Sequence, residues 1–329
     1  MIIAGDLSIE VPDTNAHHWN LEELSDMSDR DNVLMYGYNC PSNMRLLAEF
    51  QKYKRKIYFN NWAPCEFAQD KMHDVFTPMN YEEYFDEVYS ICPYTCEWMN
   101  ALELGRKYRS IFYPFHKDLI PSVQEKKYDV IYHGGIHGAE HVDCLEAMLG
   151  FNYRYVTLTH HINNLTRTFL PYATNVNLPF NEKINLVAKS KISVCYNLVH
   201  AEPLHVNNIR KCPDYKNNQA FSTIGDWNVF PQFKTRMHEG AISRTLNLVM
   251  KDEWNIAERY YVPGEEFMYF ENKKDLRDKI HEISKNWDAY QPIVDKAFKK
   301  ALSYTTEKFV ATIKEPPTKK GNNNDQNAM

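Results

Sequence analysis

Three glycines within five residues follow a short apolar run at 128–138 (YDVIYHGGIHG). The run predicts a buried strand, and Gly134, Gly135 and Gly138 predict a tight turn from that strand into a helix. Such a turn lets backbone N–H groups approach a phosphate, and the N-terminus of the next helix adds partial positive charge. Because the chain has only 11 glycines, the cluster favours a phosphate-binding turn with His137 as a donor beside the phosphate. The alternative is a tight turn that binds nothing.

His133, His137 and His141 are spaced by four residues. On one continuous helix this spacing would place three imidazoles on one face and suggest a metal site. The intervening glycines interrupt that helix, so we predict no metal site. A C-x3-C spacing at Cys92 and Cys96 also lacks the second pair that is typical of a structural zinc site.

A second group of charged residues lies at 234–241 (KTRMHEGA), where Lys234 and Arg236 precede Glu239. Cations stabilise the negative charge that grows on a departing diphosphate, and a carboxylate, which only accepts hydrogen bonds, can hold a ribose diol. The alternative is a solvated helix end whose acid stabilises the helix by about 0.3–1 kcal/mol. Two apolar stretches follow, at 246–250 (LNLVM) and 262–270 (VPGEEFMYF).

This part of the chain resembles the C-terminal part of the group-1 glycosyltransferases, particularly the spore-maturation-type branch. Members carry a basic–x–basic–x–x–Glu run, a short strand, a Pro-Gly-Glu-Glu segment and an aromatic-ended strand. The resemblance covers about residues 128–290, and residues 1–115 share only the rhythm of strands and helices. It implies a GT-B enzyme in which Glu239 binds the ribose of a nucleotide-sugar and Lys234 and Arg236 neutralise the diphosphate. It also implies that no metal or cofactor is needed, with a UDP- or GDP-sugar as co-substrate.

The chain departs from the retaining families, whose paired glutamates lie eight positions apart, because the position eight before Glu239 is Pro231. The stereochemistry of transfer is therefore left open. Asn197, in the strand expected over 191–199, is added to the donor-binding candidates. The predicted donor-binding residues are then Gly134, Gly135, His137, Asn197, Lys234, Arg236 and Glu239.

Ligands of doubly wound sheets bind beyond the carboxyl ends of the strands. In the N-terminal half this rule selects Asp6 and the segments 37–39 and 62–66 (WAPCE). Glu66 is the candidate general base, because its aromatic and proline neighbours could raise the pKa of its carboxyl group. Asp6 is the second catalytic candidate. For Glu66 the alternative is a surface glutamate in a loop.

Short β-type runs alternate with helical patterns along the chain, which predicts an α/β fold of two Rossmann-like, doubly wound domains with an interdomain cleft. The expected strands are 1–4, 32–36, 56–60, 88–92, 110–113, 128–132, 153–158, 191–199, 246–250 and 267–270. Helices are expected over 139–149 and 181–189, near 237–244 and from residue 273. Residues 200–232 lack periodicity and are expected to form a long loop.

We predict that residues 1–120 form an acceptor-side domain and residues 121–290 the donor-binding domain. The polar segment 116–127 is the expected linker. Residues 291–313 are expected to form helices that pack back on the N-terminal domain. The polar tail 314–329 is expected to be disordered.

Composition narrows the functional class. The net charge of −5 gives no global basic field for nucleic-acid binding, although it leaves a local basic patch, and so a nucleic-acid acceptor, open. The sequence has no run of about 18 apolar residues, which a membrane-spanning helix needs. Its N-terminus lacks the basic residues and following apolar stretch of a secretory signal, so we expect a cytoplasmic protein without a membrane span. Seven cysteines, an odd number in a chain of 329 residues, argue against a disulfide framework.

These observations predict a metal-independent glycosyltransferase that moves a sugar from a nucleotide-sugar to an acceptor hydroxyl, in a carbohydrate or another molecule. Two alternatives remain. A nucleotide-sugar epimerase on the same fold would isomerise the sugar without an acceptor. A catalytically silent protein would bind the nucleotide-sugar without transfer or hydrolysis.

Overall fold

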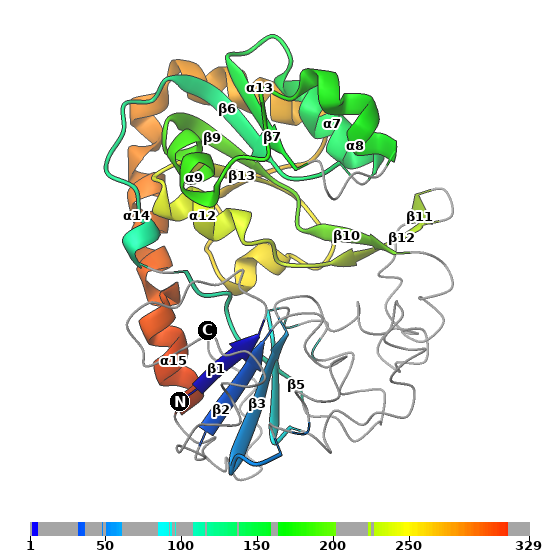
Figure 1. The fold of residues 1–329 in the computed structure, drawn as a ribbon. Coiled ribbons are helices and arrows are strands. Elements are labelled where there is room, and N and C mark those ends of the chain that lie inside the picture. Colours follow the sequence, from blue (N-terminus) through cyan, green and yellow to red (C-terminus); the bar gives the residue numbers. More distant parts are fainter. Residues whose placement is uncertain are drawn as a thin grey trace.

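The computed structural model contains two large parallel β-sheets, one in each half of the chain (Figure 1). It describes residues 2–5, 32–36, 48, 51–60, 85–91, 93, 96, 108–115, 117–136, 138–158, 164–201, 223–224 and 227–314. The predicted α/β fold class with two Rossmann-like sheets is confirmed. The domain boundaries that we expect from the sequence stay predictions.

The N-terminal sheet has five parallel strands in the order of the chain. They are β1 (Ile2–Gly5), β2 (Asn32–Tyr36), β3 (Arg55–Asn60), β4 (Glu87–Ser90) and β5 (Tyr108–Ser110). Because all five run the same way, their carboxyl ends meet at one edge of the sheet, where ligands of such sheets bind. Asp6 follows β1 directly but lies outside the described residues.

A helix from the other end of the chain covers one face of this sheet. In α15 (Thr306–Lys314), Phe309 and Ile313 are buried against Ile57 and Phe59 of β3 and against neighbouring strands. The rings of Phe309 and Phe59 meet edge to face, with centroids 4.9 Å apart. Each such buried side chain contributes about 1.5–3 kcal/mol to stability. The N-terminal sheet therefore depends on C-terminal residues for its core.

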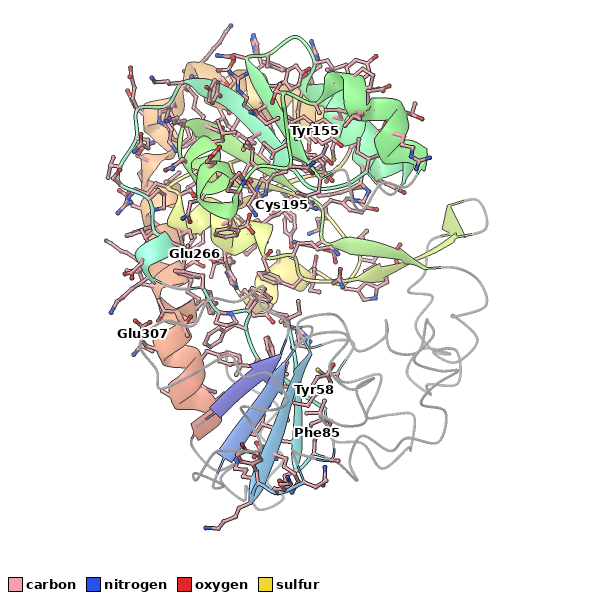
Figure 2. All side chains as sticks on the ribbon, viewed as in Figure 1. Tyr58, Phe85, Tyr155, Cys195, Glu266 and Glu307 are labelled. Carbon is pink, nitrogen blue, oxygen red and sulfur yellow. The ribbon has the colours of Figure 1, made fainter. Side chains whose placement is uncertain are left out.

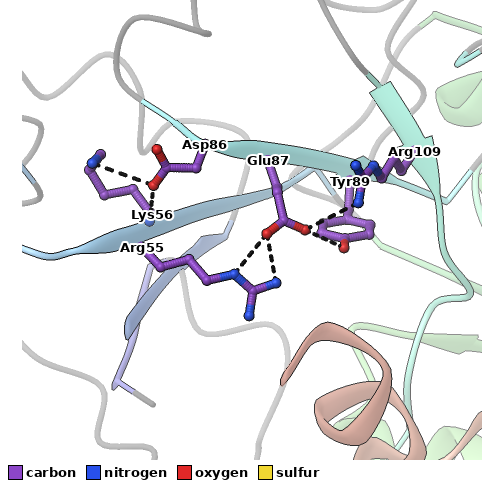
Figure 3. A network of polar contacts seen from close by, with 6 residues as sticks. All are labelled: Arg55, Lys56, Asp86, Glu87, Tyr89 and Arg109. Atoms are coloured by element: carbon purple, nitrogen blue, oxygen red, sulfur yellow. Dashed lines mark hydrogen bonds and ion pairs between the residues drawn. The ribbon is translucent and has the colours of Figure 1, made fainter. Parts of the chain in front are cut away.

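A buried carboxylate joins three strands near their amino ends, at the edge of the sheet opposite the carboxyl edge (Figure 3). Glu87 accepts a hydrogen bond from Arg55 Nε at 2.7 Å and lies 3.5 Å from Arg109 Nη1. Tyr89 also donates to Glu87, at 2.6 Å, and burial together with this carboxylate raises the pKa of Tyr89 to about 12. A buried charge is costly unless it is paired. The network therefore favours this particular register of β3, β4 and β5.

The C-terminal sheet has six parallel strands in the order β14-β13-β9-β6-β7-β8. Their bounds are β6 (Tyr128–His133), β7 (Tyr153–Thr157), β8 (Asn175–Val176), β9 (Ser190–Cys195), β13 (Leu246–Met250) and β14 (Met268–Phe270). The chain winds from β6 toward β7 and later returns to β9 on the other side of β6. This reversal marks the point where ligands bind in doubly wound sheets.

Helices cover both faces of this sheet. Alternate residues of β6 point to opposite faces, so Val130 and Tyr132 pack with α7 (Ala139–Met148) and α13 (Lys273–Lys285), while Ile131 packs with α9 (Phe180–Ala188). On the α9 side lies α12 (Arg236–Ile242). The remaining α-helices among the described residues are α8 (Asn164–Phe169) and α14 (Gln291–Ala301).

A small antiparallel sheet extends from the carboxyl end of β9 (Figure 1). Its strands are β10 (Leu198–Ala201), β11 (Thr223–Ile224) and β12 (Trp227–Pro231), and Leu198 pairs with Pro231. The expectation of a loop over 200–232 is wrong for residues 200–201, 223–224 and 227–231, and residues 202–222 and 225–226 lie outside the described residues. The strand expected over 191–199 is divided between β9 and β10. The pairing joins segments some thirty positions apart, and such short strands leave little periodicity in the sequence.

The two halves of the chain share a hydrophobic core. Phe115, which follows the N-terminal sheet, packs with residues of α12 and α14, and its backbone bonds to Tyr304 and Thr306 at 3.2 and 2.9 Å. Tyr260 adds a buried link, because its hydroxyl donates to the Ile91 carbonyl at 2.6 Å. These contacts hold the helices of the C-terminal half against the first sheet.

Tyr260→Phe is expected to lower the free energy of unfolding by about 1–3 kcal/mol, because it leaves the Ile91 carbonyl without its donor. Urea denaturation measures this change. Tyr269→Phe is the matched control, since it removes an exposed hydrogen bond to Glu258 and should cost less than about 0.5 kcal/mol. Equal losses in the two variants would contradict the importance of the Tyr260 link.

Lys126, in the segment that joins the two halves, connects the C-terminal ends of α9 and α12. Its ammonium donates to the Ala188 carbonyl at 2.8 Å and to Thr245 Oγ1 at 3.2 Å, and lies 3.5 Å from the Ser243 carbonyl. Burial, and then repulsion from Arg244, lowers the pKa of Lys126 to about 7. The lowered pKa means that burial outweighs the favourable placement of a cation at helix C-termini, so Lys126 connects the two helix ends through its hydrogen bonds.

Among the described residues, no helix has both the length and the apolar character needed to cross a membrane.

Candidate functional site

The carboxyl ends of β6 and β9 and the N-terminal part of α12 bring most of the predicted donor-binding residues together. β6 ends at His133 and leads into Gly134 and Gly135, and β9 leads into Asn197. Figure 2 shows the side chains of this half of the molecule. Arg236 opens α12, and Glu239 lies one turn further on. The parallel sheet thus places residues from three separate segments at one edge.

Gly134 makes room for the guanidinium of Arg236. Its φ of 140° belongs to a region that favours glycine, and a Cβ there would lie 2.0 Å from Arg236 Nη2. The guanidinium also lies over the ring of Tyr132, 5.1 Å from its centroid, and the Tyr132 hydroxyl donates to the Gly135 carbonyl at 2.8 Å. Arg236 Nη1 is shielded from solvent and has no hydrogen-bond partner within the part of the chain that the structure describes. An unpaired donor on a fixed cation is suited to an anionic ligand.

Glu239 is the centre of a charged network beside this arginine. Its side chain is 9% exposed, and its Oε2 lies 2.9 Å from Lys183 Nζ and 3.1 Å from His133 Nδ1. The Thr235 hydroxyl donates to the other oxygen, Oε1, at 3.3 Å. Burial alone would raise the pKa of Glu239, but Lys183, followed by His133, outweighs burial and holds the pKa well below its ordinary value. Glu239 is therefore an anion at neutral pH.

His133 closes the network on its buried side. Its ring is 2% exposed, and Nε2 lies 3.3 Å from Ser193 Oγ. Burial lowers the pKa of His133 more than the neighbouring carboxylate of Glu239 raises it, so the ring is neutral at neutral pH. The tautomer that satisfies both contacts donates from Nδ1 to Glu239 and accepts from Ser193 at Nε2.

Asn197 fixes the entry into α12. Its side-chain Oδ1 accepts a hydrogen bond from the Lys234 backbone at 3.0 Å, and its backbone carbonyl accepts from Gln232 N at 2.8 Å. Its Nδ2 lies 3.3 Å from the sulfur of Met237. Asn197 is 1% exposed, so these contacts favour a role in positioning Lys234 and Arg236.

Close packing fixes α12 against the sheet. A Cβ on Gly240 would lie 2.1 Å from Asn247 Oδ1, and Asn247 Nδ2 donates to the Met237 carbonyl at 2.9 Å. On the next face of the helix His238 contacts the Tyr261 hydroxyl at 2.7 Å, and burial lowers the pKa of His238 to about 3. The helix that carries Arg236 and Glu239 is therefore held on two sides.

Three predicted site residues, Asp6, Glu66 and His137, lie outside the described residues. Their assignments stay predictions. Within the described part of the chain, no group of three or more His, Cys, Asp and Glu side chains is arranged to hold a metal ion.

Sequence reasoning missed Lys183 and considered His133 only as a metal ligand. Lys183 lies on α9, and its pairing with Glu239 spans more than fifty positions of the chain. The available signal was indirect, because a carboxylate buried at a helix in this fold requires a cation nearby. The sequence did not indicate which of the 38 lysines and arginines would supply it.

Comparison with solved structures identifies proteins of the same fold. The chain is similar to HepE of Anabaena in complex with UDP-glucose, with a TM-score of 0.54 and 12% identity over 95% of this chain and 99% of that chain. It is also similar to S. aureus TarM, with a TM-score of 0.52 and 11% identity over 85% of this chain and 54% of that chain. The pneumococcal O-GlcNAc transferase GtfA in complex with UDP and GlcNAc has a TM-score of 0.53 and 8% identity over 89% of this chain and 58% of that chain. The chain thus spans little more than half the length of TarM and GtfA. No family model and no curated protein matches the sequence. These likenesses show a GT-B fold.

Proposed function

We propose that this protein is a glycosyltransferase that binds a nucleotide-sugar, such as a UDP- or GDP-sugar, at the carboxyl edge of its C-terminal sheet. The observation that carries the proposal is the half-buried guanidinium of Arg236 over Gly134, whose shielded Nη1 lacks a hydrogen-bond partner among the described residues. A fixed donor of this kind suits a diphosphate, and a neighbouring ionised carboxylate, Glu239, suits a ribose diol.

Each residue has a proposed role in transfer. Arg236 and Lys234 stabilise the charge that accumulates on the departing diphosphate, which is the largest single contribution in many transfer reactions. The turn at Gly134 and Gly135 brings backbone groups close to the phosphates, with His137 as a further donor. Asn197 positions the residues at the start of α12. In the N-terminal half, Glu66 or Asp6 accepts the proton of the acceptor hydroxyl.

The solved structures support a nucleotide-sugar over other ligands of this fold. HepE is described in complex with UDP-glucose, and GtfA in complex with UDP and GlcNAc. Those ligands belong to those proteins, and the extension to this chain rests on the site geometry. The spore-maturation-type relationship, a cytoplasmic location and a carbohydrate or other hydroxyl acceptor remain parts of the proposal.

A thermal-shift screen against UDP, GDP, ADP and CMP tests the donor site. A ligand at 100 times its dissociation constant stabilises the folded protein by about 2.7 kcal/mol, which gives a clear shift. The nucleotide that binds is then offered as its glucose conjugate, and release of free nucleotide is followed. No shift with any nucleotide would contradict the proposal. Isomerised sugar without an acceptor would indicate an epimerase, and binding without hydrolysis or transfer would indicate a silent binding protein.

Transfer or donor hydrolysis is expected to continue in EDTA at an undiminished rate. Arg236 and Lys234 supply the positive charge that a divalent ion supplies in metal-dependent enzymes, so the leaving group needs no metal. The rate is measured before and after dialysis against the chelator. Complete loss of activity that manganese restores would contradict this expectation.

A further inference from the structure

Two neighbouring side chains cover one oxygen of Glu239. Lys183 Nζ lies 2.9 Å and His133 Nδ1 lies 3.1 Å from Oε2, which is shielded from solvent. Among the described residues these are close charge contacts and not hydrogen bonds of standard geometry, whereas Oε1 accepts a hydrogen bond from the Thr235 hydroxyl at 3.3 Å. A ribose diol offers two hydroxyl donors, so a diol that binds both oxygens of Glu239 has to displace one of the groups that cover Oε2.

Lys183 is the partner that can leave. His133 is 2% exposed and is held from its other side by Ser193 at 3.3 Å, and Thr235 is one turn from Glu239 on the same segment. Lys183 is attached by a long flexible chain, and its side chain is 22% exposed. In its present position the ammonium also lies 4.3 Å from the centroid of the Phe180 ring, at the border of α9.

An ammonium that leaves a buried carboxylate loses a strong interaction and needs another anion. A nucleoside offers none, whereas a nucleoside diphosphate brings two phosphates to the same edge of the sheet, where Arg236 already favours an anion. We propose that Lys183 masks Glu239 in the empty protein and moves to the donor diphosphate on binding, so that the site selects phosphorylated nucleotides over nucleosides. This inference rests on the proposed function.

Two consequences distinguish this arrangement from an ordinary salt bridge. A nucleoside must compete with Lys183 for Glu239 and gains nothing in return, so its binding is weakened by the presence of the lysine. A nucleoside diphosphate gains a contact with the displaced ammonium, so its binding is strengthened by the same side chain. Removing Lys183 should therefore shift the two affinities in opposite directions.

The test is isothermal titration of UDP and uridine, and in parallel GDP and guanosine, into wild type and Lys183→Met. Nucleosides that bind weakly are measured by displacement of the diphosphate. The ratio of diphosphate to nucleoside affinity is expected to fall at least tenfold in Lys183→Met, with nucleoside binding strengthened severalfold. Lys274→Met is the matched control, because Lys274 is 88% exposed in an ion pair with Asp278 on α13, and its ratio should equal that of wild type.

An unchanged ratio in a folded Lys183→Met would overturn the masking role while leaving the proposed function intact. Weaker nucleoside binding in that variant would also overturn it, because it would mean that Lys183 supports the ribose site. Absence of nucleotide binding by wild type would overturn the proposed function, and this inference with it. Far-ultraviolet circular dichroism and thermal melting confirm folding, and Lys183→Gln, which keeps a polar side chain, replaces the methionine variant if that variant is unfolded.

Discussion

Glu239→Gln is expected to weaken nucleotide binding roughly tenfold to a hundredfold. The substitution keeps the shape of the side chain but replaces a charged acceptor with a neutral amide. Hydrogen bonds to charged groups contribute about 1.5–3 kcal/mol, which corresponds to this range of affinity. Titration of wild type and variant with UDP and GDP measures the change. A 2′,3′-dideoxynucleotide should bind wild type weakly and lose little more in the variant, because both changes remove the same contact.

The same variant should also be less stable than the sequence suggests. A helix-end charge alone would contribute less than about 1 kcal/mol. Because Glu239 is buried and paired with Lys183 and His133, we expect a loss of about 1–3 kcal/mol in the free energy of unfolding at pH 7. The lowered pKa of Glu239 stabilises the fold above its unfolded value of about 4.3, and this contribution is lost as the pH falls below that value.

Urea denaturation at pH 7 and at pH 3 checks the sign of this effect. The stability difference between wild type and Glu239→Gln should be smaller at pH 3, because only wild type loses the contribution of the ionised carboxylate. If the folded variant binds the nucleotide as tightly as wild type, Glu239 does not hold the ribose, and the donor site has to be sought elsewhere.

Gly134→Ala is expected to reduce nucleotide affinity by about thirtyfold or more and to destabilise the fold. The new Cβ would lie 2.0 Å from Arg236 Nη2, and the φ of 140° is strained for a residue with a side chain. The guanidinium must leave its place over Tyr132, so the diphosphate loses a charge-assisted contact of about 2–3 kcal/mol. Titration with UDP and GDP measures the loss of affinity.

Gly264→Ala separates backbone strain from the displacement of Arg236. Gly264 also has a positive φ, of 75°, but no heavy atom lies within 4 Å of the added Cβ position. Its substitution should cost roughly 1 kcal/mol of stability and leave nucleotide binding unchanged. The double variant Gly134→Ala with Arg236→Ala should bind no worse than Arg236→Ala alone, because both changes act on one contact. Additive losses of affinity would contradict the role assigned to Gly134.

Much of the fold could be predicted because its strands are short, apolar and locally defined. The strand expected over 246–250 is β13 with identical bounds, and the helix expected over 139–149 is α7, one residue shorter. β8 was missed, because its two residues pair with β7 and carry no periodicity of their own. β12 was missed, and only the first two residues of β10 lay within an expected strand, because these strands form by pairing with a distant segment and carry little local pattern.

The candidate site could be predicted only where the topology determines proximity. Gly134 follows β6 at the switch point of the sheet, and Arg236 begins a helix at the same edge, so the order of the strands brings the two residues together. The contact between Lys183 and Glu239 depends on how α9 packs beside α12, which no spacing in the sequence records. Asn197 was predicted from the sequence as a donor-binding residue. Its hydrogen bond with the Lys234 backbone, just before α12, could be seen only in the structure.

The packing of α15 on the N-terminal sheet has a consequence for biosynthesis. The sheet residues Ile57 and Phe59 leave the ribosome early, but their partners Phe309 and Ile313 are translated near the end of the described chain. At about 5–20 residues per second, these partners follow after roughly ten seconds or more. The contacts of Ile57 and Phe59 with these two side chains can therefore form only after the last described helix has been translated. We therefore expect the core that joins the first sheet to α15 to be completed only at the end of translation of the described chain.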